Sequence, residues 1–146
     1  MRNSRGLTLI GLMIAIVIVG IIAVIAIPNF MAMQARIKEA GVKSNCNTVK
    51  LAMEEYAVKN DGNLPNQSSL VTDLLPFLPG GKKLVNPFTR KATEPVVGTA
   101  TEPGQTAVAI QRESGNVGYT ITGFGLKGLV ITLISNPPID PRNYAL

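Results

Sequence analysis

The stretch that decides the fold is LTLIGLMIAIVIVGIIAVIAI, residues 7–27. It lies within an interval, residues 6–35, that holds no charged side chain. A helix of these 21 residues reaches about 31 Å, close to the thickness of the hydrocarbon core of a bilayer. So long an uncharged apolar segment does not suit the surface of a water-soluble domain, and it predicts a helix that spans a membrane.

The residues on either side of this stretch indicate its orientation and its class. Arg2 and Arg5 precede it, and the positive-inside rule therefore places this end in the cytoplasm and the rest of the chain across the membrane. An ordinary secretory signal has an apolar core of roughly 7 to 15 residues and a small-residue cleavage site. Here the apolar run is longer and continues into Ile27-Pro28-Asn29-Phe30. The sequence therefore favours a membrane-associated segment over an ordinary signal peptide.

The composition excludes several classes of chemistry. The 146 residues include no His, which excludes His-based acid–base catalysis and His-ligated metal. Cys46 is the sole cysteine, so an intrachain disulfide, a CxxC redox pair and a cysteine-based zinc site are excluded as well. Glu54 and Glu55 are adjacent and would point about 100° apart on a helix, which does not suit a carboxylate dyad. We expect no enzyme activity, no catalytic residue, no cofactor and no metal.

The charge balance disfavours a nucleic-acid partner. The formal net charge is +5, from 14 basic and 9 acidic residues. Without Arg2 and Arg5, which precede the apolar run, the balance is 12 minus 9, or +3. No run of five or more basic residues supplies a stripe that would bind phosphates.

The start of the chain resembles a known family. The run RGLTLIGLMI (residues 5–14), the Ile- and Val-rich continuation with Gly20, and the closing Ala26-Ile27-Pro28 resemble the class III leader and N-terminal helix of type IV pilins and type II secretion pseudopilins. The resemblance covers about the first 60 residues. It implies a prepilin leader of residues 1–6, cleavage between Gly6 and Leu7 by a prepilin peptidase, and methylation of the new Leu7 amine by the same enzyme.

The resemblance also implies a second use for the apolar helix, residues 7–28. It would anchor the subunit in the inner membrane and then, through the inner-membrane assembly machinery, become the core of a self-assembled helical filament. The filament would be an extracellular pilus or a periplasmic pseudopilus. In such filaments the helix often loosens between the positions of Gly20 and Pro28, in keeping with the low helix propensity of Gly and Pro.

One position departs from the family pattern. The family usually has Glu at the fifth residue after cleavage, where this chain has Gly11. The glutamate is thought to pair with the N-terminal ammonium of a neighbouring subunit in an apolar core, where an unpaired charge is costly. Here the Leu7 amine would need another partner, such as the Thr8 hydroxyl, a backbone carbonyl or a trapped water. We therefore assign Thr8, Gly11, Gly20 and Pro28 to assembly and expect Gly11 to mark a minor, tip-proximal or divergent subunit.

Residues 29–60 predict an amphipathic continuation of the helix. The charged residues include three i,i+4 pairs, Glu39–Lys43, Lys50–Glu54 and Glu55–Lys59. The sequence around Gly62 and Pro65 then predicts the end of the helix, with Gly62 in the left-handed position that follows it. Apolar side chains recur at spacings of three and four, at Phe30, Met33, Ile37, Ala40, Val42, Cys46, Val49, Met53 and Tyr56.

Residues 61–146 predict a loop-rich head. A short helix is expected over 68–75 and a loop over 82–104. Three strands are expected over 106–112, 117–122 and 128–134, joined by hairpins. The run Gly123–Gly128 matches GxGxxG literally, but a strand-like segment follows it, so we interpret the glycines as a hairpin turn rather than a nucleotide site. The fold class is α+β: a long N-terminal helix with a small antiparallel β-sheet head packed on it.

These observations predict a structural subunit of a type IV pilus-like filament. Two alternatives remain open: a pseudopilin of a type II secretion system, and a membrane-anchored periplasmic binding module that contacts DNA during uptake.

Overall fold

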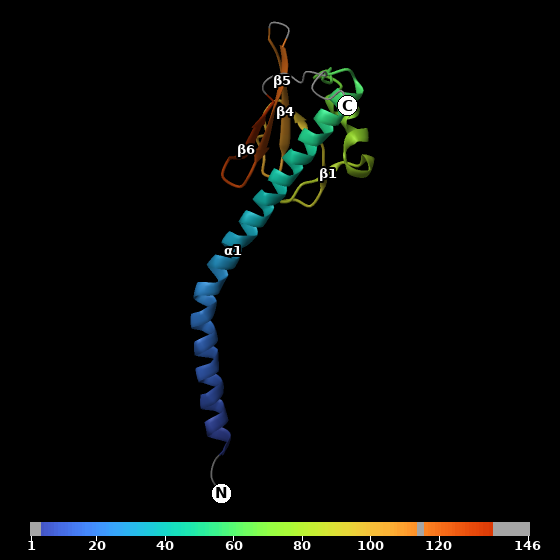
Figure 1. Ribbon diagram of the computed structural model, residues 1–146. Helices are drawn as coiled ribbons and strands as arrows, with labels where there is room; N and C mark the ends of the chain where they lie inside the picture. Colours follow the sequence, from blue (N-terminus) through green and yellow to red (C-terminus); the bar gives the residue numbers. More distant parts are fainter. Residues whose placement is uncertain (1–3, 114–115, 136–146) are drawn as a thin grey trace. The chain divides into compact units, whose positions relative to one another are not determined.

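The computed structural model describes residues 4–113 and 116–135, with side chains described for 9–112 and 117–135. The chain divides into two compact units, Met1–Arg36 and Ile37–Leu146. The first unit is the N-terminal part of helix α1 (Ser4–Lys59), shown in blue in Figure 1. The helix is unbroken through Gly20 and Pro28 in the isolated chain.

The end of α1 follows the predicted position but differs in detail. The amide N–H of Gly62 donates to the carbonyl of Ala57 at 2.8 Å, the six-to-one bond of a Schellman motif. In that motif the residue before Gly62 occupies the first left-handed position, and Asp61 has φ of 54°. Gly62 is also left-handed, with φ of 81°. The first left-handed residue is therefore Asp61 and not Gly62 as predicted, because the helix ends one residue earlier than the glycine alone suggests.

A four-stranded sheet forms the centre of the head. The three predicted strands are confirmed as β4 (Thr106–Glu113), β5 (Asn116–Phe124) and β6 (Leu129–Ile134), paired antiparallel. A fourth, two-residue strand, β3 (Val96–Val97), pairs parallel to β4. The sheet order is β3-β4-β5-β6. The sheet therefore has one strand more than the predicted meander, a short edge strand that is parallel to β4.

The segment between α1 and the sheet contains regular secondary structure. It contains α2 (Leu70–Leu74) and two 3₁₀ turns, η1 (Leu75–Phe77) and η2 (Pro79–Gly81). It also contains a two-stranded antiparallel ribbon of β1 (Leu84–Val85) and β2 (Ala92–Thr93). The predicted short helix is confirmed in a shorter form, while the expectation of a plain loop over 82–104 is wrong. Each of β1, β2 and β3 is only two residues long, too short to produce a readable alternation of apolar and polar side chains.

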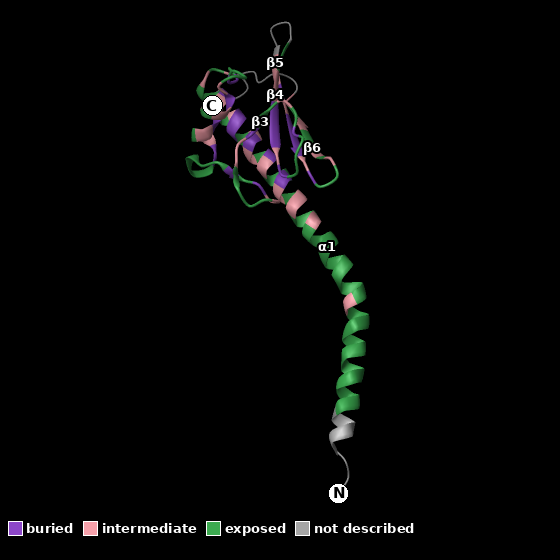
Figure 2. Cartoon of the chain, turned by 180° about the vertical axis from the view of Figure 1, so that it is seen from behind, coloured by how far each residue is buried: buried purple, intermediate pink, exposed green. Residues whose placement is uncertain are grey.

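The core of the head lies between α1 and the sheet, where the buried residues concentrate (Figure 2). The helix contributes buried side chains at spacings of three and four, which is one face of an α-helix. The predicted stripe is therefore confirmed from Val42 onward, whereas its earlier members Phe30, Met33 and Ile37 are exposed. Buried residues of the cluster include Val42, Cys46, Val49, Met53 and Ala57 from α1, Leu70 and Leu74 from α2, and Val108, Tyr119 and Ile121 from the sheet.

Candidate functional site

The N-terminal part of α1 presents an apolar surface. Its large apolar side chains from Leu9 to Ile27 are exposed to between 52% (Ile18) and 74% (Val24) of their maximal area. Among the described residues, one helix is long and apolar enough to span a membrane, with a mean hydropathy of 3.3 over its most apolar window and none of that window buried. Exposure of so large an apolar surface to water is energetically unfavourable for a monomer, so lipid or other protein must cover it.

Gly11 and Gly20 have no neighbour among the described residues that requires a glycine. A methyl group added at Gly11 or Gly20 would meet nothing within 4 Å. Pro28 lies inside the helix and lacks the N–H that would bond to the carbonyl of Val24. The two glycines and the helix hydrogen bond that Pro28 cannot donate therefore lie on a surface whose contact partners are not among the described residues. Gly6, Leu7 and Thr8 belong to α1 by their backbone, but their side chains lie outside the described part of the structure.

In the head, α1 packs closely on the sheet at Gly123. An ideal Cβ at this position would lie 2.7 Å from Cys46 Sγ, 2.8 Å from Val42 Cγ1 and 2.9 Å from Ile131 Cγ2. Gly123 is a residue of strand β5, so its role is close packing of strand against helix and not the hairpin turn that the sequence suggested.

The other two glycines of the GxGxxG run do belong to the β5–β6 connection. The Gly125 N–H donates to the Gly128 carbonyl at 2.7 Å, and Gly128 has φ of 140°. A Cβ at Gly125 would clash with Val130 and would lie 3.2 Å from Glu39 Cγ of α1. All three glycines are therefore explained by turn geometry and packing, and the following segment is strand β6 rather than the helix that a dinucleotide site needs.

Cys46 is fully buried in the helix–sheet core. Its Sγ lies 3.7 Å from Thr106 Oγ1, a contact in which either group can donate. Burial raises the pKa of the Cys46 thiol above its ordinary value, although the hydrogen bond to Thr106 acts to lower it. The thiol is therefore neutral and inert at physiological pH, which is the behaviour of a small core residue.

Polar contacts fix the turn that joins β1 to β2. The Asn86 side chain accepts hydrogen bonds from the N–H groups of Phe88 (2.8 Å) and Thr89 (3.1 Å), and its amide donates to the Pro103 carbonyl at 3.0 Å. Asn86 is only 8% exposed. A single side chain thus satisfies three backbone groups and joins two turns. Asn86 was not among the residues predicted from sequence, although Asn followed by Pro favours a turn. Its two local bonds belong to that turn, and only the bond to the Pro103 carbonyl joins it to a distant loop.

Two of the three predicted charged pairs on α1 are confirmed. Lys59 Nζ lies 2.8 Å from Glu55 Oε1, and Lys50 Nζ lies 3.6 Å from Glu54 Oε1. The prediction of a Glu39–Lys43 pair is wrong, because these two side chains form no ion pair within the described residues. Glu39 instead lies against the β5–β6 turn at Gly125.

Within the described residues, no group of three or more His, Cys, Asp or Glu side chains gathers in a way that would hold a metal ion.

Comparison with known proteins bears on the exposed apolar segment. Residues 1–27 match the prokaryotic N-terminal methylation motif. The chain carries a prepilin-type N-terminus. The match contains the predicted leader and most of the apolar helix, and it agrees with the resemblance seen in the sequence.

The relatives of this chain include pilus components and competence proteins. It is 45% identical over 59 residues to the type IV major pilin protein PilA of Myxococcus xanthus, covering 40% of this chain and 27% of that protein. It is 36% identical over 72 residues to the type IV wide pilus major component PilA4 of Thermus thermophilus, covering 49% and 55%. The competence protein ComGC of Bacillus subtilis is 26% identical over 87 residues, covering 57% and 89%.

These similarities are partial. The matched part of this chain spans about a quarter and about half of the length of the two pilus components. No solved structure matches the chain significantly. The relatives named as pilus components are structural proteins, which supports a non-enzymatic role indirectly.

Proposed function

We propose that this chain is a structural subunit of a type IV pilus-like filament that assembles through its N-terminal helix. The observation that carries the proposal is the exposed apolar surface of α1 from Leu9 to Ile27, on a segment that matches the prepilin-type motif. Such a surface is stable in only two settings, a bilayer and an apolar protein core, and a filament subunit occupies one after the other.

The processing step is proposed at the peptide bond between Gly6 and Leu7. A prepilin peptidase would hydrolyse this bond, release residues 1–6 and methylate the Leu7 amine. Removal of Arg2 and Arg5 takes away the charged side chains that precede the apolar segment, and leaves the new Leu7 amine as the charge at its start. Such a change would help an apolar helix to leave the bilayer for a protein core, because buried charge is costly in either medium.

Within the filament, Thr8, Gly11, Gly20 and Pro28 are the residues we assign to assembly. Gly11 and Gly20 would allow neighbouring helices to approach closely, which is the role of small residues where apolar helices pack. The missing N–H of Pro28 would let the helix loosen locally. In the absence of a glutamate at Gly11, the Thr8 hydroxyl or a backbone carbonyl would accept a hydrogen bond from the Leu7 amine.

The test of processing is an intact mass after co-expression of the full chain with a prepilin peptidase. The mass should fall by that of residues 1–6 and rise by one methyl group. A Gly6→Leu variant provides the control, since a bulky side chain next to the cleaved bond should leave the leader in place. An unprocessed wild-type chain beside an active peptidase and a processed reference pilin would overturn the filament proposal.

Filament assembly has its own test. Electron microscopy of material sheared from cells that express the full chain and an assembly system should show fibres that contain it. Gly11→Glu should change its incorporation, because the new carboxylate would give the Leu7 amine a charged partner. Unchanged incorporation would remove the proposed role of Gly11 while leaving the filament proposal intact.

A second candidate function is a competence pseudopilus component. The observation that favours it is coverage, since the match spans 89% of the Bacillus subtilis competence protein but only 27% of the Myxococcus xanthus pilin. A short periplasmic or wall-spanning filament would be absent from sheared surface material yet present in the envelope fraction. Loss of transformation without loss of surface fibres in a deletion strain would favour this function over a surface pilus.

A further inference from the structure

One end of the head, residues 37–146, gathers unpaired cations. Two turns lie against the same stretch of α1: the β1–β2 turn, Asn86–Lys91, and the β5–β6 turn, Gly125–Gly128. Lys38 Nζ lies 5.6 Å from the centroid of the Phe88 ring in the first turn. An ideal Cβ at Gly125 in the second turn would lie 3.2 Å from Glu39 Cγ. Both turns therefore flank adjacent residues of the helix.

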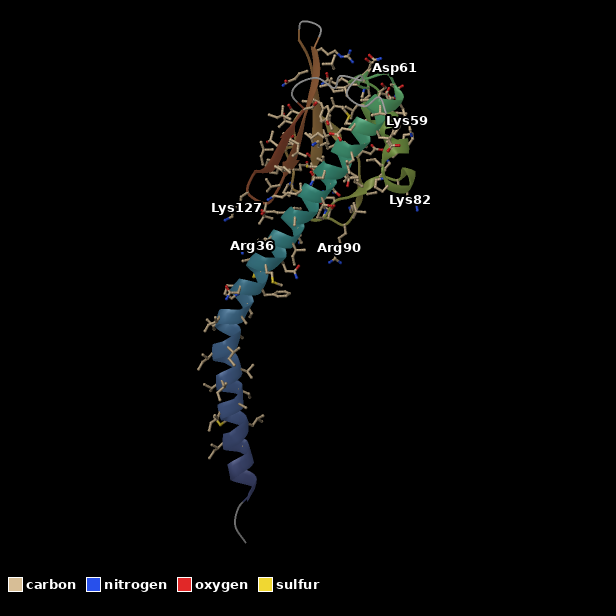
Figure 3. All side chains as sticks on the ribbon, viewed as in Figure 1. Arg36, Lys59, Asp61, Lys82, Arg90 and Lys127 are labelled. Atoms are coloured by element: carbon tan, nitrogen blue, oxygen red, sulfur yellow. The ribbon has the colours of Figure 1, made fainter. Side chains whose placement is uncertain are left out.

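These three elements bring five basic residues to what we call the basic end: Lys38 and Lys43 of α1, Arg90 and Lys91 of the first turn, and Lys127 of the second. Figure 3 shows Arg90 and Lys127 at this end and Lys59 and Asp61 at the opposite end of the head. Arg90 is exposed, with φ of 58°, and Lys91 and Lys127 are exposed as well. Two carboxylates lie in the neighbourhood, Glu39 and Glu102, so the local balance is positive.

The cations of the basic end differ from three basic residues elsewhere in the head, although Lys82 and Arg112, also outside the basic end, likewise form no ion pair within the described residues. Lys50, Lys59 and Lys83 each form an ion pair with a glutamate, at 3.6, 2.8 and 2.8 Å. None of the five cations of the basic end belongs to an ion pair within the described residues. Their charges are thus available to an anionic partner outside the chain.

The basic end lies close in the chain to the apolar segment. Lys38 follows Pro28 by ten positions, which as helix amounts to about 15 Å. The exposed side chains of Met31 and Met33 are apolar, and the first charged residue after them is the exposed Arg36, two positions before Lys38. The surface therefore changes from apolar to basic within a few residues. Such a boundary suits the level of the lipid headgroups, because anionic headgroups attract nearby Lys and Arg.

We propose that the basic end binds the headgroups of anionic phospholipids while α1 spans the membrane. This inference rests on the membrane-anchored stage of the proposed function and deepens it. The contacts hold the head against the bilayer surface before assembly, and they are lost when the subunit is extracted. The fraction of anionic lipid then tunes how readily the subunit leaves the membrane.

The test uses the full chain in lipid nanodiscs with a spin label at Leu126→Cys, an exposed position of the second turn, in a Cys46→Ala background. The readout is relaxation of the label by a small fixed fraction of lipid that carries chelated Ni²⁺ on its headgroup. Relaxation should increase when phosphatidylglycerol partly replaces phosphatidylcholine, and the increase should disappear in high salt. Equal relaxation in both lipids would overturn the proposal.

Two variants with the same change in charge provide the comparison. Arg90→Gln/Lys91→Gln/Lys127→Gln should lower the ratio of docked to undocked heads by about fivefold per neutralised residue. Lys50→Gln/Lys59→Gln/Lys83→Gln should leave the ratio unchanged. An equal effect of the two variants would overturn a specific docking surface.

Other outcomes separate this proposal from its alternatives and from the proposed function. A basic end that binds a labelled DNA duplex, together with no response to phosphatidylglycerol, would identify a nucleic-acid surface and overturn lipid binding. A chain that enters nanodiscs but shows no lipid response overturns only this inference. A chain that does not enter nanodiscs overturns the membrane-anchored stage as well.

Discussion

Gly123→Ala should destabilise the head, because the added methyl has no space. Its ideal position lies under 3.0 Å from three atoms, Cys46 Sγ, Val42 Cγ1 and Ile131 Cγ2. Each atom is attached directly to its own Cβ, so none can swing away as the tip of a long side chain would. Val42 and Cys46 are also fully buried. The helix and strand must therefore move apart, which typically costs about 1–3 kcal/mol for overpacking in a core.

The expected size of the effect follows from the size of the head. A loss of about 2 kcal/mol in a unit of roughly 100 residues lowers the melting temperature by about 10 °C. Thermal unfolding of the full chain in detergent micelles, followed by circular dichroism, measures this shift. Gly118→Ala is the matched control on the same strand, since its Cβ would meet only the Ser135 carbonyl oxygen, at 3.1 Å, and its effect should be smaller.

A second substitution tests the cause. In Gly123→Ala/Val42→Ala the shortened helix side chain vacates part of the space that the new methyl needs, so the double variant should be more stable than the sum of the two single effects by about 1 kcal/mol. A Gly123→Ala chain with the same melting temperature as the wild type would refute the close-packing argument. Strict additivity of the two substitutions would show that Val42 is not the obstacle.

Three further predictions concern the head. Asn86→Ala should lower the free energy of unfolding by about 2–3 kcal/mol, because three backbone groups lose their partner. The control Asn45→Ala loses one exposed bond to the Val85 carbonyl and should lower it by under about 1 kcal/mol. Urea unfolding measures both. Asp61→Gly should raise the melting temperature by about 2–4 °C, since glycine adopts the left-handed position without strain; a lower value would contradict the assigned cap. Burial raises the pKa of the Cys46 thiol, so the unfolded thiol loses its proton at a lower pH than the folded one. The stability of the wild type relative to Cys46→Ala should therefore fall as pH rises above about 8.5 and stay level below it; denaturant unfolding at several pH values measures this, and a rise would reverse the argument.

The sequence was sufficient for features whose physical cause is local. The charge-free run from residue 6 to 35 indicates a membrane-length helix by itself, and three- and four-residue spacing from Val42 to Met53 indicates the buried face of its continuation. Alternation in Val117, Tyr119 and Ile121 likewise located strand β5. The first depends on the length and composition of one continuous stretch, and the other two depend on a repeat that is visible along the chain, of 3.6 or 2 residues.

The tertiary structure decided what depends on contacts between distant residues. Phe30, Met33 and Ile37 are exposed although they continue the apolar spacing, and periodicity carries no information on that point. Gly123 is required by side chains of α1 that lie about 80 positions earlier in the chain, and Asn86 by a carbonyl on another turn. The basic end likewise exists only because two turns fold against Lys38 and Glu39, so cations scattered along the sequence become one surface.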